Sequence, residues 1–315
     1  MGADASLSGR PMVQVYDTNT GALITQFLAY EPSYHGGVRV ALGDVNGDGS
    51  TEIITAPGLN HAPQIKVFDL SGHELTQFRF NAYAAGFIDG VQLAVGDFNG
   101  DGLADIATVP SFGPAEVRVF DNQLRSNPAQ PFSSAPARDF RAFAANFMGG
   151  GTIAAADLNG DGRAELVVGS GPGMTATIAE YDVSKPAASY TPLRTIIPFG
   201  TSFRGGVSVA VAGTGVDPTP DILAAAGSSG GSQIRTYSAG GALLASTTAF
   251  SGSSSNAPVR AVAKSSQANG QLDAVFAAQG PGGRTQQIRH APLKGQYLDW
   301  LLEHDPDFQG GFFLA

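Results

Sequence analysis

The 315-residue sequence predicts an all-β protein, a six-bladed β-propeller built from four-stranded antiparallel blades. An acidic nine-residue loop recurs at Asp44, Asp97 and Asp157, with spacings of 53 and then 60 residues. A period of this size is typical of propellers and repeat arrays. Short apolar runs with period-two alternation flank each loop, and 42 Gly and 19 Pro residues separate them, as expected for many short strands.

Each repeat contains four predicted strands. In the first complete repeat they cover residues 38–43, 53–56, 65–69 and 75–80, and the third ends in a turn-forming Asp. An aromatic-x-Gly-Gly element precedes the first strand at residues 34–37, 147–150 and 203–206. We expect its aromatic side chain to pack between blades and its glycines to form a tight turn.

Two further segments occupy the same frame as the acidic loops but lack most of their carboxylates. They are residues 213–221 and 265–273, and both keep the flanking strands. We expect these two loops to bind metal weakly or not at all. The repeat is therefore architectural first, with metal ligands present in only some of its copies.

The two ends of the chain complete one blade. Residues 308–315 match the start of a repeat and stop after its first strand, whereas the N-terminus begins at a second strand, residues 3–6. Pairing these segments would close the ring and leave only short strand edges. The segment around Trp300 is expected to be a fourth strand, with a helical turn as the alternative. We thus predict one domain, residues 1–315, with blades at residues 311–315 plus 1–30, 37–83, 90–146, 150–200, 206–250 and 258–306.

The acidic loops have the ligand pattern of a hard divalent cation, which takes six to eight oxygen atoms. Oxygen-bearing side chains lie at the first, third, fifth and ninth positions, glycine at the sixth allows the backbone to reverse, and a carbonyl at the seventh can add a ligand. An EF-hand is excluded because it needs a carboxylate at the twelfth position and flanking helices. The alternative is a metal-free turn made by Asp and Asn. The predicted ligands are Asp44, Asn46, Asp48, Ser50 and Glu52 in the first loop, Asp97, Asn99, Asp101, Leu103 and Asp105 in the second, and Asp157, Asn159, Asp161, Arg163 and Glu165 in the third.

The charge balance agrees with ion binding. The net charge of −9 equals the nine carboxylates of the three loops, and an acidic chain argues against a nucleic-acid partner. The sequence has no Cys, so disulfides and thiolate metal sites are excluded. No apolar run reaches the ~18 residues of a membrane span, and the N-terminus does not have the pattern of a signal peptide. We expect a monomeric module of a longer protein that is secreted or displayed at the cell surface, where calcium is abundant.

The Asp-x-Asn-x-Asp-Gly-x-x-Asp/Glu loop followed by an apolar strand resembles the FG-GAP repeats of integrin α-subunit propellers and the related VCBS-type repeats of bacterial surface proteins. The aromatic-x-Gly-Gly element supports this resemblance, which covers essentially the whole chain. It implies that each acidic loop binds Ca²⁺ between the first two strands of a blade, chiefly for rigidity, with about three ions in all. The chain departs from integrins in having six predicted blades rather than seven and no inserted metal-dependent domain.

No catalytic constellation stands out, so the sequence favours a noncatalytic protein without deciding the matter. The Gly-x-Ser-x-Gly match at residues 227–231 lies in a Gly/Ser-rich loop with no helix expected after it. The loops opposite the acidic ones are the better candidates for a binding face. That face is predicted to carry Tyr34, His35, Asn60, His61, Tyr83, Phe112, Arg204 and Arg284.

Three functions remain open from the sequence. The first is a noncatalytic calcium-binding module for adhesion or for recognition of a protein or glycan ligand. The second is a carbohydrate-active lyase or glycosidase with its site in the mouth of the channel. The third is a structural spacer of a surface protein.

Overall fold

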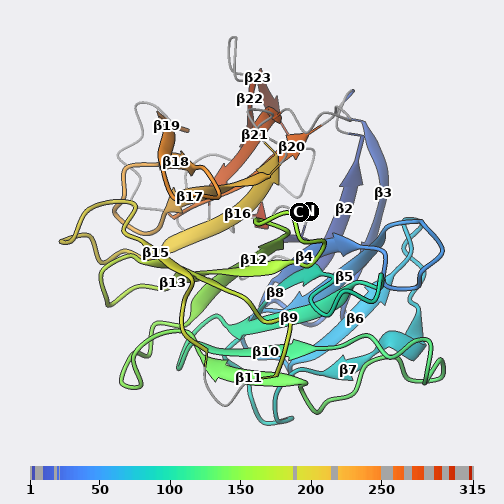
Figure 1. Cartoon of the computed structure of the whole chain (residues 1–315). Helices are drawn as coiled ribbons and strands as arrows, with labels where there is room; N and C mark the ends of the chain where they lie inside the picture. The colour runs from blue at the N-terminus through green and yellow to red at the C-terminus, as the bar shows by residue number, and fades with distance from the viewer. Residues whose placement is uncertain are drawn as a thin grey trace.

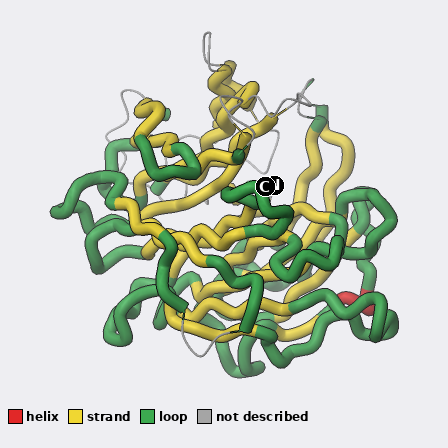
Figure 2. Tube along the Cα trace, viewed as in Figure 1, coloured by secondary structure: helices red, strands yellow, loops and turns green. Residues whose placement is uncertain are grey.

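The computed structural model of the chain describes residues 2–3, 10–17, 20, 22–186, 190–213, 219–249, 258–265, 272–279, 287–292, 298–301 and 312–313. These residues form strands and loops, and their one helical element is the 3-10 turn η1 (Thr76–Phe78) (Figure 2). The all-β prediction is therefore confirmed. Within the described part of the chain, no helix has the length and apolar character needed to cross a membrane.

The described strands pair into antiparallel sheets of four strands each, as the sequence predicts (Figure 1). In five of these sheets the strands lie side by side in chain order. The strands of these five sheets are β4 (Val38–Gly43), β5 (Glu52–Pro57), β6 (Gln64–Phe68) and β7 (Phe80–Asn81); β8 (Val91–Gly96), β9 (Asp105–Pro110), β10 (Glu116–Phe120) and β11 (Arg138–Arg141); β12 (Gly151–Ala156), β13 (Glu165–Ser170), β14 (Ile178–Tyr181) and β15 (Arg194–Ile196); β16 (Val207–Gly213), β17 (Pro220–Ala226), β18 (Gln233–Tyr237) and β19 (Leu243–Thr248); and β20 (Val259–Ser265), β21 (Leu272–Gln279), β22 (Gln287–Pro292) and β23 (Leu298–Leu301).

A further sheet combines strands from the two ends of the chain, in the order β24, β1, β2, β3. These strands are β24 (Phe312–Phe313), β1 (Gly2–Ala3), β2 (Met12–Tyr16) and β3 (Leu23–Leu28). Ala3 pairs with Phe312 and Gly2 with Phe313. The segment around Trp300 forms β23, so it is a strand rather than a helical turn.

The first strand of each sheet lies towards the middle of the molecule and the fourth lies towards the outside (Figure 1). Each of these inner strands contacts the next along the chain: β4 contacts β8, β8 contacts β12, β12 contacts β16, and β16 contacts β20. The sheets therefore pack face to face in chain order around a common central region.

The second strands lie in the densest part of this packing. Every residue of β5, β9 and β13 is buried. After an acidic first residue their sequences are mostly apolar, the pattern of strands that are covered on both faces. The hydrophobic clusters span neighbouring sheets: one combines Ile54 and Val67 with Ile106 of the next sheet, and another combines Val117 with Leu166. The core thus lies between the sheets.

A repeated cation–aromatic contact joins adjacent sheets. The Lys66 ammonium lies 4.8 Å from the centre of the Tyr30 ring and donates to the Ala29 carbonyl at 3.0 Å. The contact recurs one sheet further on, where Arg118 covers the ring of Tyr83 at 4.7 Å and donates to the carbonyl of the preceding residue at 3.2 Å. Each tyrosine also donates its hydroxyl to the backbone of the next sheet. These contacts add directional bonds to an otherwise apolar interface.

The aromatic-x-Gly-Gly element brings two backbone segments together at one end of the inner strands. A Cβ atom at Gly149 would lie 2.1 Å from the Pro172 carbonyl oxygen and 2.5 Å from the Phe147 ring. Gly150 follows with a φ of 66°, so the predicted tight turn is confirmed. Phe147 belongs to a cluster shared by two sheets, in agreement with the predicted packing between blades. The same approach occurs where Gly36 meets the carbonyl of Leu59 and where Gly205 meets that of Ser228.

We expect Gly149→Ala to destabilise the fold by about 1–3 kcal/mol, because the added methyl group would overlap a backbone carbonyl. Gly86→Ala is the matched control, since a Cβ there meets no atom within 4 Å, and its effect should stay within about 0.5 kcal/mol. Urea denaturation of the two variants measures the difference. Equal midpoints would show that the close approach at Gly149 relaxes without cost.

Candidate metal loops and axial pocket

Each acidic loop connects the first and second strands of its sheet. The residue before the loop pairs with the ninth residue of the loop: Gly43 with Glu52, Gly96 with Asp105, and Ala156 with Glu165. The ninth residue is therefore also the first residue of a fully buried strand. The hydrogen bonds of the hairpin therefore fix both ends of each loop. The conformation of the residues between these ends depends on bonds within the loop.

Hydrogen bonds to the backbone turn the first three oxygen-bearing side chains inward. In the first loop, Asp44 accepts from the N–H groups of Gly47 and Gly49 at 2.7 and 2.9 Å. Asn46 accepts from the Asp48 N–H at 2.8 Å. Asp48 in turn accepts from the N–H of Ser50, and these bonds hold the pKa of the Asp48 carboxyl below its usual value.

The second and third loops repeat this arrangement. Asp97 and Asp157 each accept from three N–H groups of their own loop, and Asn99, Asp101, Asn159 and Asp161 each accept from the N–H two residues later. The glycines at the fourth and sixth positions all have positive φ values. The three loops therefore share one backbone conformation, set by the same residue types at the same positions.

The ninth-position carboxylates differ from the others because they are buried. Glu52, Asp105 and Glu165 are 2%, 0% and 2% exposed. Glu52 and Glu165 accept from the N–H of the loop's second residue, both at 2.9 Å. Burial raises the pKa of Glu52, and it raises the pKa of both Asp105 and Glu165 to about 7. A cation beside these groups would favour their ionised forms.

The side chains of the three acidic loops are of the types that bind a hard cation. Carboxylate and amide groups occupy the predicted ligand positions of each loop, and oxygen atoms are the ligands that Ca²⁺ prefers. The Asn46 and Asn159 amide groups donate to Glu52 and Glu165 at 2.8 and 2.7 Å, so both Asn side chains lie against the ninth-position carboxylates. Among the described residues, no three or more His, Cys, Asp or Glu side chains are already grouped so that they could hold a metal ion. The metal ligands therefore remain a prediction that rests on donor type and loop conformation.

Neighbouring loops are joined to one another. The Ala104 N–H, at the eighth position of the second loop, donates to the Asp44 carbonyl of the first at 3.3 Å. The Ala164 N–H of the third loop donates in the same way to the Asp97 carbonyl of the second, at 2.8 Å. Side chains at the seventh position lie against the preceding loop, since a Cβ at Gly47 would meet the Leu103 side chain at 3.0 Å. The three loops thus form a row across three sheets.

Asn122 strengthens this row, and its role was not predicted from the sequence. It is 4% exposed, and its side-chain amide donates to the carbonyls of Val45 and Ala104, which belong to different loops. Its backbone N–H donates to the Asp105 carboxylate at 2.7 Å. In the sequence, Asn122 differs from the other repeats only in its residue type. It follows the turn residue Asp121, and the equivalent positions of other repeats hold Thr18, Leu70 and Val183.

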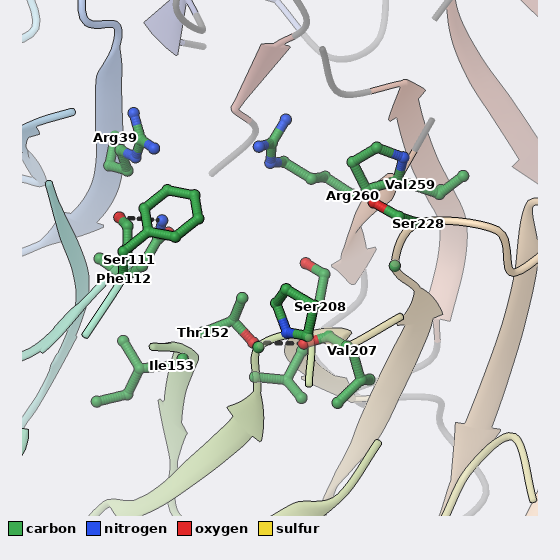
Figure 3. Close-up of a pocket in the computed structure, with 18 of the residues that line it drawn as sticks. Arg39, Ser111, Phe112, Thr152, Ile153, Val207, Ser208, Ser228, Val259 and Arg260 are labelled. Atoms are coloured by element: carbon green, nitrogen blue, oxygen red, sulfur yellow. Dashed lines mark hydrogen bonds between the residues drawn. The ribbon is translucent and has the colours of Figure 1, made fainter. Parts of the chain in front are cut away.

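The opposite ends of the inner strands surround a cavity of about 450 Å³ (Figure 3). Five lining residues occupy the same position in five repeats, the second residue of the inner strand. They are Arg39, Gln92, Thr152, Ser208 and Arg260. We refer to these five residues as the axial ring. Aligning the first strands of the repeats would have revealed the ring, since all five residues are polar among apolar neighbours.

The described lining of the cavity is positively charged. It contains the guanidinium groups of Arg39 and Arg260 and no Asp or Glu. Arg39 is 7% exposed and donates to the Gly36 carbonyl at 3.5 Å. Gln92 donates to the Ser111 hydroxyl at 2.9 Å, and Ser111 also belongs to the lining. The arrangement can bind an anion together with polar uncharged groups.

The predicted binding face is only partly assembled here. Phe112 lines the cavity and is 48% exposed. Tyr34 is buried, and its ring lies 4.8 Å from that of His61, whose Nε2 is 3.3 Å from a Glu31 carboxylate oxygen. His35 and Asn60 are exposed without lining the cavity.

Three other predictions for this face have different outcomes. Tyr83 lies in the cation–aromatic contact between sheets, because its ring is 7% exposed and covered by Arg118. Arg204 donates to the carbonyls of its own loop. Arg284 lies outside the described residues, as do most of the degenerate loops at 213–221 and 265–273.

The Gly-x-Ser-x-Gly match at residues 227–231 precedes strand β18 rather than a helix. It therefore lacks the strand-turn-helix context of a catalytic serine.

Comparison with known proteins supports the sequence analysis. The family described as FG-GAP-like repeat matches residues 44–108 and 97–168, which include all three acidic loops. Residues 44–168 therefore carry FG-GAP-like repeats. Integrin alpha-PS5 of Drosophila melanogaster is 30% identical to this chain over 155 residues, covering 44% of this chain and 15% of the integrin. This chain therefore spans a small part of that relative's length.

Two solved structures align with this chain over most of its length. A triple arginine-to-alanine mutant of AofleA from Arthrobotrys oligospora aligns with a TM-score of 0.57 and 11% identity, covering 95% of this chain and 82% of that one. A rhamnogalacturonan lyase from Bacillus licheniformis aligns with a TM-score of 0.48 and 19% identity, covering 88% of this chain and 55% of the lyase. Similarity at such low identity concerns the fold alone.

We expect Asn122→Ala to lower the free energy of unfolding by about 1–3 kcal/mol, because it leaves buried carbonyl groups of two loops without their donor. Asn127→Ala, at an exposed position of the following loop, is the control and should change stability by less than about 0.5 kcal/mol. Chemical denaturation reports both. If Asn122→Ala unfolds like the control, the two loops are not coupled through this side chain.

Proposed function

We propose that the chain is a noncatalytic, calcium-stabilised six-bladed β-propeller that recognises a ligand at its axial pocket. The observation that carries this proposal is the division of the molecule into two ends. Oxygen donors gather in three loops at one end of the inner strands, and a cavity that combines apolar walls with the polar axial ring lies at the other. Loops and pockets held on a rigid scaffold are common sites of recognition.

The strand contacts support a ring of six blades. Inner strands contact one another in chain order from β4 to β20, and β24 contacts both β21 and β4. The sheet that joins β24 to β1, β2 and β3 would then be the blade that closes the ring. A closed ring leaves no long exposed strand edge, which favours a stable monomeric domain.

Calcium would be held by the side chains of the first, third, fifth and ninth positions and by the carbonyl of the seventh. The ion would supply positive charge beside carboxylates that the fold buries at the start of the second strands. Because the loops are bonded to one another, an ion in one loop would also stiffen its neighbour. Backbone N–H groups of the loop donate to the Asp and Asn oxygens and so orient these ligands before an ion binds.

The lining of the pocket favours recognition over catalysis. Glycosidases use a pair of carboxylates, and the described lining contains no Asp, Glu, His or Tyr. A cavity lined by two arginines and several hydroxyl groups is also more than a structural spacer would need. The ligand would be a protein or glycan that presents a group small enough to enter the pocket, as expected for adhesion or surface recognition.

A location outside the cell or at its surface follows from the same features. The integrin relative supports it, and so does the calcium dependence proposed for the loops, since extracellular modules bind calcium at concentrations of about 0.1–1 mM. The chain would act there as one module of a larger protein.

Removal of calcium should lower the melting temperature, because the ion binds only the folded loops. Each site filled at a hundred times its Kd adds about 2.7 kcal/mol. Thermal unfolding in saturating CaCl₂ and in excess EDTA measures the effect, with MgCl₂ as the control, since Mg²⁺ demands a tighter octahedral site. An identical melting temperature in CaCl₂ and EDTA would contradict the calcium proposal.

A single-loop variant tests the ligand assignment. Asp48→Ala should reduce the number of calcium ions bound in calorimetry by about one and shrink the melting-temperature difference between CaCl₂ and EDTA. Asp89→Ala is the control, because Asp89 is an exposed carboxylate outside the loops. The calcium-dependent difference is the readout, since Asp48→Ala also removes the bond to the Ser50 N–H. Full stoichiometry in Asp48→Ala would show that Asp48 is not a ligand.

A further inference from the structure

The five residues of the axial ring have the same kind of neighbour on the second strand of their sheet. They pair across to small or apolar residues of the second strands: Ala56, Val109, Gly169, Ala225 and Ala278. None of these paired residues carries a polar side chain beside the ring residue. The glycine contacts described above form the adjoining wall from backbone, with Gly36, Gly171 and Gly205 all lining the cavity. Among the described lining residues, the ring and the serines Ser111 and Ser228 supply the polar side chains, and the other side chains are apolar.

The ring combines two kinds of chemistry. Arg39 and Arg260 approach the open space from opposite sides, and Thr152 and Ser208 lie along its lower edge (Figure 3). Guanidinium groups bind carboxylates with paired, charge-assisted hydrogen bonds. Hydroxyl and amide groups both donate and accept, as the hydroxyls of a ligand require. Ser111 and Ser228 add two more hydroxyls to the lining.

An apolar surface completes the pocket. The Phe112 ring extends into the open space beside the Arg39 strand (Figure 3), and it is 48% exposed. An exposed aromatic ring beside polar side chains suits the C–H face of a sugar ring, since ligand sites combine apolar walls with a few placed polar groups. The cavity of about 450 Å³ lies within the usual range of small-molecule sites, ~300–1,000 Å³.

We propose that the axial pocket binds a sugar acid, that is, a small polyhydroxylated carboxylate. The carboxylate lies between Arg39 and Arg260, and the hydroxyl groups of the ligand meet Gln92, Thr152 and Ser208. This inference rests on the recognition role proposed above and names the ligand class. The same chemistry is offered by a free sugar acid and by a sugar acid at the end of a glycan.

Isothermal titration calorimetry of the full chain in CaCl₂ tests the proposal with D-glucuronate, D-glucose, acetate and inorganic phosphate. Glucuronate should bind with one-to-one stoichiometry and at least tenfold more tightly than the other three. Glucose binding as tightly as glucuronate would overturn the role of the arginines. Acetate or phosphate binding as tightly would overturn the role of the hydroxyl groups, and absence of glucuronate binding would overturn the proposal as a whole.

Methyl β-D-glucuronide distinguishes the two sources of the ligand. Binding equal to that of glucuronate supports a terminal residue of a glycan, because the glycoside blocks the anomeric hydroxyl. Loss of binding with the glycoside, while glucuronate still binds, supports the free acid.

Variants connect the binding to the ring. Arg260→Gln should weaken glucuronate binding at least tenfold, and Ser208→Ala should weaken it several-fold without creating a preference for acetate. Arg204→Gln is the matched control, because Arg204 is an exposed arginine near the same strand ends but outside the lining. Arg39→Gln is a second test, accompanied by circular dichroism because Arg39 is buried. Wild-type affinity in Arg260→Gln would contradict the proposal.

The outcome is separable from that of the calcium proposal. A chain that is stabilised by calcium and binds no glucuronate contradicts only the sugar-acid assignment. A chain that binds glucuronate and has the same melting temperature in CaCl₂ and EDTA contradicts only the calcium role.

Discussion

Burial of a carboxylate at the start of each second strand is the constraint on which the acidic end of the molecule depends. Glu52, Asp105 and Glu165 begin strands that are buried at every residue. Their side chains must turn back into the loop to find partners, and there they bond to the N–H of the loop's second residue. The loop conformation, the spacing of its other donors and the contact with the next loop all follow from this arrangement.

Backbone packing sets the other end in a comparable way. Where Gly149 meets the Pro172 carbonyl, no side chain can be accommodated, so main chain forms this part of the molecule beside the cavity. Two residues after the second glycine of each pair comes the second residue of the inner strand, whose side chain lines the cavity. A charged residue there is buried on one side by the neighbouring sheet, as Arg39 is, and faces the cavity on the other. The glycine pairs therefore create both the space and the position that fills it.

The periodicity of the sequence was sufficient to predict the strands and the acidic loops, because period-two alternation and turn glycines are local signals. Contacts between sheets were not predictable in the same way. The stacking of Lys66 on Tyr30 joins residues from different repeats, and nothing in either segment alone indicates it. Tyr83 was assigned to the binding face for this reason, although it packs under Arg118. Asn122 was missed because its bonds to Val45 and Ala104 depend on the placement of two other loops.

The two ends of the repeat vary independently, which bears on what each end does. The segment at 213–221 has lost the carboxylates of the first and third positions, yet its inner strand still carries Ser208 in the axial ring. The segment at 265–273 has lost more of them, yet its inner strand carries Arg260. If the ring residues served only to support an acidic loop on the same strand, they would have no purpose in these two repeats. A polar residue that persists where the acidic loop is absent has its role at the pocket, and two of the five are arginines that face the same open space.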